Sequence, residues 1–376
     1  MSSTNIKIAP NHIHICHLSS VHHSYDSRVF DKECVSLAKN GFKVTLIIIH
    51  DKSEQIEGVS IVPFKKYRSR FLRALFSPWV MLPKALKTKA DLFHFHDPEL
   101  MPLAIILKIF RKKVVMDVHD DVIDFMGNKK YLPSIFRYPI GYSYRFLQVI
   151  TTKIIDAVVT ATPHIAESFP SKKTTVVQNF PSTNDFQGIT TIPYEQRNNI
   201  IIYSGLLHEN TGFKSIVESS KLLPEGAIIQ IIGKIYPTSL KKELESCKNI
   251  EYISWSDRKS VLHKIKNAKI GFALYQPTKQ NIYAQPRKLF EYMAAGIPII
   301  ASDSKLWKEF VEENNAGINV DPASIDQIVE AVQFLTVNPS EAKQMGHNAR
   351  IAFENKYDWQ KESDKLVNLY SNLLSK

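Results

Sequence analysis

Cysteine is scarce in this chain, which has three cysteines in 376 residues. Cys16, Cys34 and Cys247 are far apart and form no Cys-x-x-Cys pair, which argues against a disulfide scaffold and a cysteine-ligated zinc site. The first twenty residues lack the continuous apolar core of a signal peptide. No window approaches the roughly 20 apolar residues of a membrane span. These absences predict a cytoplasmic protein with reduced thiols.

Glycine-rich phosphate-binding motifs are also missing. The segment SSVHHSYDSRVF, which follows the first expected strand, contains no glycine. An NAD-binding Rossmann domain needs glycine there, because the backbone must approach the pyrophosphate closely. The missing G-x-G-x-x-G motif disfavours a dehydrogenase, and the chain has no Walker loop either.

Positive charge is plentiful and unevenly spread. The chain has 48 Lys and Arg against 37 Asp and Glu, a formal net charge of +11. Residues 1–185 hold 25 of the basic residues and 16 of the acidic ones. We therefore expect an acidic partner to meet the first half. Nucleic acid, an anionic membrane surface and a phosphorylated substrate all satisfy that charge.

Short β-rich runs alternate with helical patterns along most of the chain, which predicts parallel sheets with right-handed crossovers. In the first half, strands are expected at 13–19, 43–49, 91–96, 113–119, 156–162 and 173–179. In the second half, strands are expected at 199–205, 227–233, 250–255, 269–275 and 297–302. The segment 180–199 is rich in Pro, Thr, Asn and Gln and is interpreted as a linker. The sequence therefore predicts an α/β protein with two doubly wound domains.

The most informative stretch is QPRKLFEYMAAGIPIIASD at 285–303. Pro286 suits the start of a helix, which places Arg287 and Lys288 beside the free N–H groups of its first turn. Cations there oppose the helix dipole, and a bound diphosphate would reverse that penalty. Glu291 follows one turn later, where its carboxylate could accept two ribose hydroxyls. The alternative is a surface ion pair between Arg287 and Glu291.

This stretch resembles the donor-binding signature of the retaining glycosyltransferases of family 4, whose fold is GT-B. Other segments agree with that family in order and spacing; they are HHSYDSRVFDKE, LAKNGFKVTLI, FHFHDPELMPLA, VVMDVHDD, AVVTATPHIAESF, VVQNFP, IIYSGLLHENTGF and YDWQKESDKLVNLY. The resemblance implies two Rossmann-like domains facing a central cleft, with the acceptor bound by 1–185 and the nucleotide sugar by 195–356. It also implies that a helix over 357–376 crosses back to the first domain. The members that the chain resembles build bacterial cell-surface polysaccharides.

The resemblance assigns donor-binding roles to Gly205, Lys234, Trp255, Tyr283, Arg287, Lys288 and Glu291. Glu291 matches the second glutamate of the family's Glu-x7-Glu motif, which holds the donor ribose. Tyr283 stands in place of the first glutamate, which is a departure from the motif.

A second departure concerns the diphosphate. Leu206 and Thr211 stand where the family often has an arginine and a lysine that contact it. Arg287 and Lys288, with Lys214 or Lys234 nearby, must then supply the missing charge.

The resemblance implies that the catalytic residues are His119, Lys288 and Glu291. The family's histidine at the position of His119 lies beside the transferred sugar, so it would hydrogen-bond a sugar hydroxyl or hold the reacting centre through a neighbouring backbone carbonyl. A structural histidine at a strand end is the alternative. The acceptor side is expected to be shaped by His22, Tyr25, Asp26, Arg28, Asp97 and Glu99. A simple pair between Asp26 and Arg28 is the alternative for those two residues.

His94 and His96 share a strand face, as His12 and His14 do, and a His-x-His pair is a common metal-binding arrangement. The sequence shows no third ligand beside either pair, and enzymes of the GT-B fold generally work without a bound metal. We therefore expect no metal and no cofactor, because the nucleotide-diphosphate sugar is a substrate.

Two basic spans, 65–89 and 125–155, are predicted to contact an anionic membrane surface. The first interleaves Phe71, Leu75 and Trp79 with lysines and arginines, and the second mixes basic and aromatic residues. An apolar stripe flanked by cations is typical of a helix in a membrane interface. An amphipathic helix packed on its sheet is the alternative. The family's lipid-linked acceptors favour the membrane, so we expect a peripheral protein on the inner face of the cell membrane.

These expectations define a retaining glycosyltransferase of the hexosyl type (EC 2.4) that moves a sugar from a nucleotide sugar to a hydroxyl of a lipid-linked or growing surface polysaccharide. Two rival interpretations are left open. A nucleotide-sugar epimerase, or a non-catalytic member of the fold, would fit the missing charges at Leu206 and Thr211. A nucleic-acid-binding protein would fit the net charge, but the basic spans contain no recognised nucleic-acid motif, so we expect no nucleic acid as partner.

Overall fold

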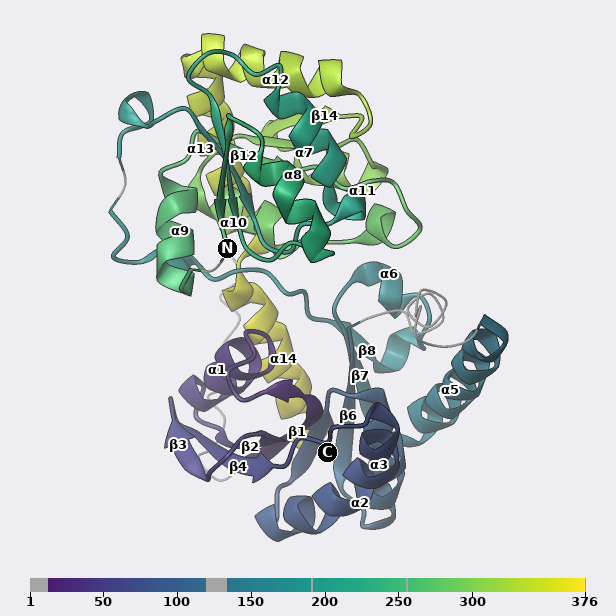
Figure 1. Ribbon diagram of the computed structural model, residues 1–376. Helices are drawn as coiled ribbons and strands as arrows, with labels where there is room; N and C mark the ends of the chain where they lie inside the picture. Colours follow the sequence, from purple (N-terminus) through teal and green to yellow (C-terminus); the bar gives the residue numbers. More distant parts are fainter. Residues whose placement is uncertain (1–12, 120–133, 191, 255, 376) are drawn as a thin grey trace. The chain divides into compact units, whose positions relative to one another are not determined.

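The computed structural model describes residues 13–119, 134–190, 192–254 and 256–375. The chain divides into two compact units (Figure 1). The first contains Met1–Asn179 and Trp359–Lys376, and the second contains Phe180–Asp358. The first unit thus ends at Asn179 where 185 was expected, and its returning segment begins at Trp359 where 357 was expected. Both units are α/β, which confirms the predicted fold class.

The sheet of the first unit is mostly parallel. Its described strands follow the order β3-β4-β2-β1-β5-β6-β7-β8, and among them only the β3–β4 pair is antiparallel. Their bounds are β1 (His14–His23), β2 (Lys43–Ile49), β3 (Glu54–Ile56), β4 (Val59–Phe64), β5 (Leu92–Phe95), β6 (Lys113–Val118), β7 (Ala157–Thr160) and β8 (Thr174–Val176). All predicted strands of this half are present. The prediction missed β3 and β4, because β3 is very short and β4 contains Pro63, a residue that argues against a strand.

Helices cover both faces of this sheet (Figure 1). One face packs against the π-helical turn η1 (Val29–Cys34), α1 (Val35–Lys39) and the C-terminal α14 (Trp359–Leu374). The other face packs against α2 (Arg70–Thr88), α3 (Met101–Ile109) and α5 (Ser134–Ile154), and the short α6 (Pro163–Ala166) follows β7. Neighbours such as Ile15 and Cys16 enter opposite layers, as the two-residue period of a strand requires. Within the described residues, every helix is too short or too polar to span a bilayer.

The sheet of the second unit is parallel in every pair of described strands, in the order β11-β10-β9-β12-β13-β14. The strands are β9 (Ile200–Ser204), β10 (Ile228–Ile232), β11 (Ile250–Ile253), β12 (Ile270–Ala273), β13 (Ile299–Ser302) and β14 (Gly317–Val320). The helices are α7 (Phe213–Ser220), α8 (Lys241–Glu245), α9 (Arg258–Lys266), α10 (Arg287–Ala295), α11 (Lys305–Phe310), α12 (Ile325–Val337) and α13 (Pro339–Ala352). The prediction missed β14, whose short Gly-Ile-Asn-Val sequence carries little strand signal.

The segment 180–199 is not a free linker, which corrects the interpretation from its composition. Phe180, Phe186, Ile189 and Tyr194 are buried in the cores of the second unit. These apolar residues are spaced among the polar ones, and their burial ties the segment to the second sheet.

Candidate functional site

The N-terminus of α10 is suited to an anion. Pro286 precedes the helix with φ of −68°, and no side chain of the described residues caps the first turn. The N–H groups at the start of a helix lack acceptors within it and carry the positive end of the helix dipole. Arg287 and Lys288 add two cations to this turn, as predicted.

Lys288 carries a buried ammonium group without a hydrogen-bond partner. The residue is 6% exposed, and Nζ has no acceptor among the described residues. Nζ lies 3.2 Å from the centre of the Tyr203 ring and 5.4 Å from that of Tyr275, so aromatic faces replace part of the lost water. Burial lowers the pKa of Lys288 well below its usual range, although the charge of Glu291 opposes this shift. A buried cation without an acceptor is costly until an anion joins it.

The turn after β9 brings bare backbone next to Lys288. Gly205 has φ of 110°, and a Cβ built on it would lie 3.7 Å from Cε of Lys288. Gly233, which follows β10, has φ of 140°, and a Cβ there would lie 2.2 Å from the carbonyl oxygen of Gly205. Glycine at both positions lets the two turns meet at the carboxyl edge of the sheet, where doubly wound folds bind ligands.

Leu206 and Thr211 occupy the two loop positions at which the resemblance implies an arginine and a lysine. Here both residues take part in hydrogen bonds within the loop. The buried Thr211 hydroxyl donates to the carbonyl of Leu206 at 3.2 Å and accepts from the backbone N–H of His208 at 2.9 Å. Leu206 is 49% exposed. Lys214 and Lys234 are exposed, so Lys288 is the lysine that lies buried against this turn.

Glu291 is the buried member of a partly exposed ion cluster. Its Oε1 lies 2.7 Å from Nη1 of Arg258 and 2.8 Å from Nε of Arg287. Asp185 Oδ2 approaches Nη2 of the same arginines, at 3.5 Å and 3.4 Å respectively. The Arg287–Glu291 pair of the alternative interpretation therefore exists, with a buried carboxylate and a partly exposed guanidinium, because Glu291 is 4% exposed and the Arg287 side chain 25%. Sequence reasoning missed Arg258 and Asp185 because only the fold brings them to α10.

The other predicted donor-site residues are more scattered. Tyr283 closes the 3-10 turn η8 (Asn281–Tyr283) and is 46% exposed. Lys234 follows Gly233 at the end of β10 with an exposed side chain. Trp255 lies outside the described residues. Their donor contacts stay predictions.

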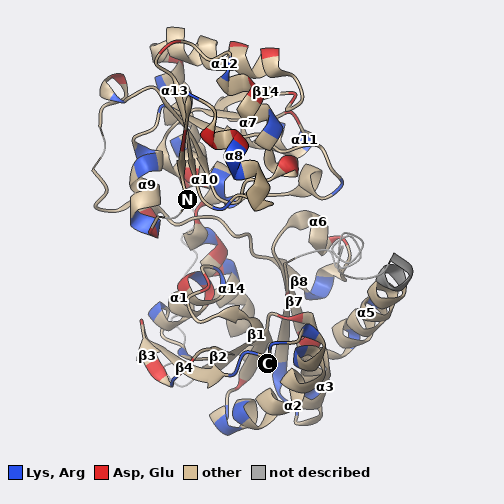
Figure 2. Cartoon of the chain, in the orientation of Figure 1, with Lys and Arg blue, Asp and Glu red and all other residues tan. Residues whose placement is uncertain are grey.

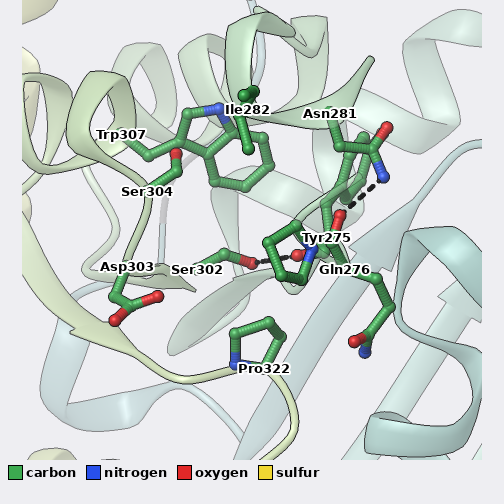
Figure 3. Close-up of a pocket in the computed structure, with 10 residues that line it drawn as sticks. Tyr275, Gln276, Asn281, Ile282, Ser302, Asp303, Ser304, Trp307 and Pro322 are labelled. Carbon is green, nitrogen blue, oxygen red and sulfur yellow. Dashed lines mark hydrogen bonds between the residues drawn. The ribbon is translucent and has the colours of Figure 1, made fainter. Parts of the chain in front are cut away.

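A small pocket lies in the second unit where β12 and β13 end (Figure 3). Its walls are formed by Tyr275, Gln276, Pro277, Asn281, Ile282, Ser302, Asp303, Ser304, Trp307 and Pro322. The Ser302 hydroxyl donates to the Tyr275 carbonyl at 2.8 Å, and the Asn281 amide donates to the Gln276 carbonyl at 2.9 Å. Tyr275 joins this pocket to the Lys288 environment. No predicted site residue lines it, because its walls come from separate loops that share no sequence motif.

In the first unit, alternate residues on one face of three strands change from apolar to polar toward the carboxyl edge of the sheet. By the two-residue period, these rows are Ile15-His17-Ser19 on β1, Leu92-His94-His96 along and just after β5, and Val115-Asp117-His119 along and just after β6. The apolar members belong to the core under α14. The polar members form a buried cluster beyond it.

His119 lies at the outer end of this cluster. Its side chain is 22% exposed, and Nε2 lies 3.5 Å from Oδ2 of Asp117. Its ring stacks on that of His96, with 5.9 Å between centroids. Burial, opposed by the charge of Asp117, lowers the pKa of His119 to about 3. The imidazole is therefore neutral near pH 7 and offers one donor and one acceptor nitrogen.

Arg28 and Asp26 serve different partners. Nη2 of Arg28 lies 3.2 Å from Oδ1 of Asp117, and its Nε lies 3.1 Å from Oε1 of Glu33. Asp26 Oδ1 accepts from the backbone N–H groups of Arg28 at 2.9 Å and Val29 at 3.0 Å. Arg28 thus anchors the buried cluster, while Asp26 starts the helical turn that follows.

Asp97 and Glu99 hold the end of β1. Asp97 Oδ2 accepts from the Ser19 hydroxyl and the Ser20 N–H, both at 2.7 Å. Glu99 accepts from the Ser20 hydroxyl and pairs with Nε of Arg73, both at 2.6 Å. These carboxylates shape the loop through their bonds within it.

His22 and Tyr25 are the accessible members of the predicted acceptor set. The His22 side chain is 28% exposed, with Nδ1 2.9 Å from the Ser19 hydroxyl. Tyr25 is 57% exposed, and its hydroxyl donates to Glu54 at 3.0 Å. Their contact with an acceptor stays a prediction.

The helix α2 presents an exposed apolar stripe. Lys and Arg residues lie on the same helix (Figure 2) and just before it. Phe71, Leu75 and Trp79 are 74%, 48% and 56% exposed, whereas Met81 and Ala85 are buried. The exposed cations of the span are Lys65, Lys66, Arg68, Arg70, Lys87 and Lys89. On α5, Tyr142 and Phe146 are exposed in the same way. Residues 125–133 of the second basic span lie outside the described part.

Known families match both halves of the chain. Residues 27–183 match the model described as Glycosyltransferase Family 4. Residues 191–352 match the model described as Glycosyl transferases group 1. Together with the two α/β units, these matches identify the chain as a glycosyltransferase with the GT-B fold. Among curated proteins, no sequence matches this chain.

Solved structures agree on the fold over nearly the whole chain. Sucrose-phosphate synthase from Thermosynechococcus elongatus has a TM-score of 0.72 at 15% identity, covering 96% of this chain and 99% of that one. HepE of Anabaena, solved with UDP and glucose, has a TM-score of 0.71 at 12% identity, covering 96% and 100%. The UDP-forming α,α-trehalose-phosphate synthase from Burkholderia vietnamiensis has a TM-score of 0.72 at 11% identity, covering 97% and 100%.

Proposed function

We propose that the protein transfers a hexosyl group, with retention of configuration, from a nucleotide-diphosphate sugar to a hydroxyl of a lipid-linked or growing surface polysaccharide. The proposal of a nucleotide-sugar donor depends mainly on one observation. The buried ammonium of Lys288 has no hydrogen-bond partner among the described residues and lies beside Gly205, which has no side chain. UDP in the HepE structure, and the UDP-forming reaction of trehalose-phosphate synthase, support a nucleotide donor.

In the second unit, the diphosphate would lie between the start of α10 and the turn after β9. The helix N–H groups and Lys288 would oppose the negative charge that grows on the leaving diphosphate as the glycosidic bond breaks. Arg258 and Arg287 hold Oε1 of Glu291, so Oε2 would accept from the ribose hydroxyls. This positive charge is the reason we propose transfer without a catalytic metal.

In the first unit, the neutral imidazole of His119 would hydrogen-bond a hydroxyl of the transferred sugar. His22 and Tyr25 would contact the acceptor directly. The remaining predicted acceptor residues would act through the loop geometry that they fix. Holding the acceptor hydroxyl against the sugar carbon contributes by orientation, which can supply several kcal/mol of the barrier.

The stripe on α2 would bring the first unit to an anionic membrane, where lipid-linked acceptors lie. Its exposed aromatic residues would enter the headgroup region, and the cations around it would meet acidic lipids. We therefore propose a peripheral location on the inner face of the cell membrane.

A donor screen followed by an acceptor assay tests the proposal. UDP-, GDP- and other sugar nucleotides are added to the full chain, and the correct donor should raise Tm, because a ligand that binds only the folded state stabilises it. Release of nucleoside diphosphate should then depend on a lipid-linked acceptor, and NMR of the product should show the donor's anomeric configuration.

Three outcomes would overturn the proposal. Conversion of the sugar nucleotide without acceptor would indicate an epimerase. Absence of stabilisation by every sugar nucleotide would indicate a non-catalytic member of the fold. Retention of RNA or DNA on a filter at moderate salt would favour nucleic acid as the acidic partner.

A further inference from the structure

The buried cluster of the first unit contains a set of metal-ligand atoms that come from separate parts of the chain. His17 on β1, Glu33 on η1, and His94 and His96 at β5 each offer one such atom, and the four atoms lie within 4.8 Å of one another. The four side chains are wholly shielded from solvent. We propose that these four residues bind a divalent transition-metal ion, with Zn²⁺ as the ion that suits the set best.

Four of the six distances between these atoms are near the spacing of tetrahedral coordination. Oε2 of Glu33 lies 3.9 Å from Nδ1 of His17, 3.8 Å from Nδ1 of His94 and 3.8 Å from Nε2 of His96. Nδ1 of His17 lies 2.9 Å from Nε2 of His96. Ligands about 2.0–2.1 Å from a tetrahedral Zn²⁺ are about 3.3 Å apart. The contacts of Glu33 are too long for hydrogen bonds, yet all are within about 0.6 Å of the spacing that a shared ion needs.

Glu33 gives an independent reason to expect a ligand. Neither of its carboxylate oxygens has a hydrogen-bond partner among the described residues. Arg28 Nε lies 3.1 Å from Oε1, and Oε2 faces the three imidazoles at 3.8–3.9 Å. A fully buried carboxylate oxygen in this position is costly unless a cation or donor joins it. An ion at the centre would take Oε2 and leave Oε1 to Arg28.

The outer contacts of His96 match those of a metal-bound imidazole. Its Nδ1 lies 3.1 Å from Oδ2 of Asp117. An ionised carboxylate can only accept there, so the proton is on Nδ1 and the lone pair of Nε2 points into the cluster. A carboxylate behind a histidine is the usual outer shell of a metal site. Asp117 therefore positions His96. Because Asp117 also lies two residues before His119 in the same strand row, it connects the metal site to that candidate catalytic residue.

Two hydrogen bonds must be lost when the ion binds. One joins Nδ1 of His17 to Nε2 of His96, both of which would bind the metal, and the other is made by Tyr370. The Tyr370 hydroxyl of α14 lies 2.5 Å from Nδ1 of His94, the atom that would bind the metal. The same hydroxyl lies 3.5 Å from Nε2 of His17, which needs an acceptor for its proton once Nδ1 binds the ion. A small rotation of the phenol exchanges the first contact for the second. The ion would thus fasten η1 to β1 and β5 and would leave the donor site of the second unit untouched.

The metal content of the wild-type chain is the primary test. The full chain is expressed in zinc-supplemented medium without a histidine tag, and the metal is counted by mass spectrometry after gel filtration. We expect about one Zn²⁺ per chain, a lower Tm after chelation, and recovery when Zn²⁺ is added back. Co²⁺ in its place should give the visible absorption of a tetrahedral site. A metal-free chain whose Tm does not respond to Zn²⁺ overturns the proposal.

Variants assign the site. Glu33→Gln keeps the side-chain shape and should lose stoichiometric Zn²⁺, whereas Asp117→Asn should keep the ion with about 10- to 100-fold weaker affinity. His164→Gln is the matched control, because His164 forms a surface pair with Glu167 at 3.5 Å, and it should bind like wild type. Loss of Zn²⁺ in His164→Gln together with retention in Glu33→Gln would show adventitious surface binding and overturn the proposal. The wild-type cobalt spectrum decides the case if Glu33→Gln does not fold.

Discussion

The Lys288 ammonium lies against the face of Tyr203, 3.2 Å from the ring centre, and next to the Cβ-less backbone of Gly205. A ring face attracts a cation by about 2 kcal/mol when water is excluded. Removing a charge from water costs several kcal/mol even after relaxation. Tyr203 therefore holds the ammonium in place without compensating it, and an incoming anion can supply the rest.

We expect Lys288→Met to lower kcat by on the order of 10²-fold, as the loss of one strong donor to a developing charge does. Affinity for the intact donor should fall less, because the N–H groups of α10 still hold the ground-state phosphates. Adding Arg287→Ala should lower kcat further. Steady-state kinetics with a matched donor and acceptor measure this. Lys234→Met is the control, since that side chain is exposed; a larger loss there would move the diphosphate to Lys234.

The same Lys288→Met change should stabilise the ligand-free protein near neutral pH. Burial lowers the pKa of Lys288 in the folded state, so between that pKa and the unfolded value of about 10.4 the unfolded chain binds more protons and stability rises with pH. The folded wild-type chain thus recovers stability as the pH approaches about 10.4. Melting curves from about pH 7 to 10 should show a Tm advantage of the variant that shrinks steadily. A constant advantage would mean that packing, not charge, separates the two proteins.

Glu291→Gln should weaken binding of the sugar nucleotide by about 10- to 100-fold, because hydrogen bonds to a charged group contribute about 1.5–3 kcal/mol. Asp185→Asn is the matched control. It contacts the same two arginines at longer distances and is not expected to meet the ribose. Calorimetric titration with the nucleotide measures both affinities. Equal losses in the two variants would reduce Glu291 to a member of the ion cluster.

Gly233→Ala should lower Tm and abolish nucleotide binding, because the new Cβ would lie 2.2 Å from the carbonyl oxygen of Gly205. Gly226→Ala is the control: its φ is 78°, and nothing lies within 4 Å of a Cβ built there. Backbone strain at such angles costs of order 1–3 kcal/mol in both variants. The excess loss in Gly233→Ala measures the close approach of the two turns. Equal melting points would show that this approach is not needed.

Reversing the charges of Lys65, Lys66, Arg68 and Lys87 together with Trp79→Ser should release the protein from anionic vesicles. Each cation near such a surface contributes about 1 kcal/mol. The chosen lysines and arginine are exposed, so the fold should survive. Co-sedimentation with phosphatidylglycerol vesicles measures binding, and the rise in Tm caused by the sugar nucleotide should be unchanged. Reversal of Lys241 and Lys242 on α8 is the control, and a wild-type chain that never sediments disproves the membrane contact.

The fold was largely readable because strand length, β-branched composition and turn residues agree along the chain. Where these signals conflict, the prediction failed. Pro63 hides β4, and the short β14 looks like a turn. Composition predicts a linker over 180–199, because composition alone does not show which few apolar residues become buried.

The sequence predicts those parts of the site whose residues are close together in the chain. Arg287, Lys288 and Glu291 belong to one helix, so helical geometry places them together. The partners of Glu291 come from other segments, and so does Glu33 of the histidine cluster. Strand periodicity places both His17 and His94 on the same face as buried apolar residues of their strands. No sequence pattern, however, shows which strands are neighbours in the sheet.

The first unit is closed by residues from the very end of the chain. Trp359, Leu366 and Tyr370 of α14 are buried in its core, although the whole second unit lies between them and Asn179 in the sequence. On the ribosome, therefore, the unit made first must wait for the codons of α14 before its apolar face is covered. A chain released early would keep that face exposed to chaperones and proteases. The position of α14 thus makes synthesis through this helix a condition for a stable first unit.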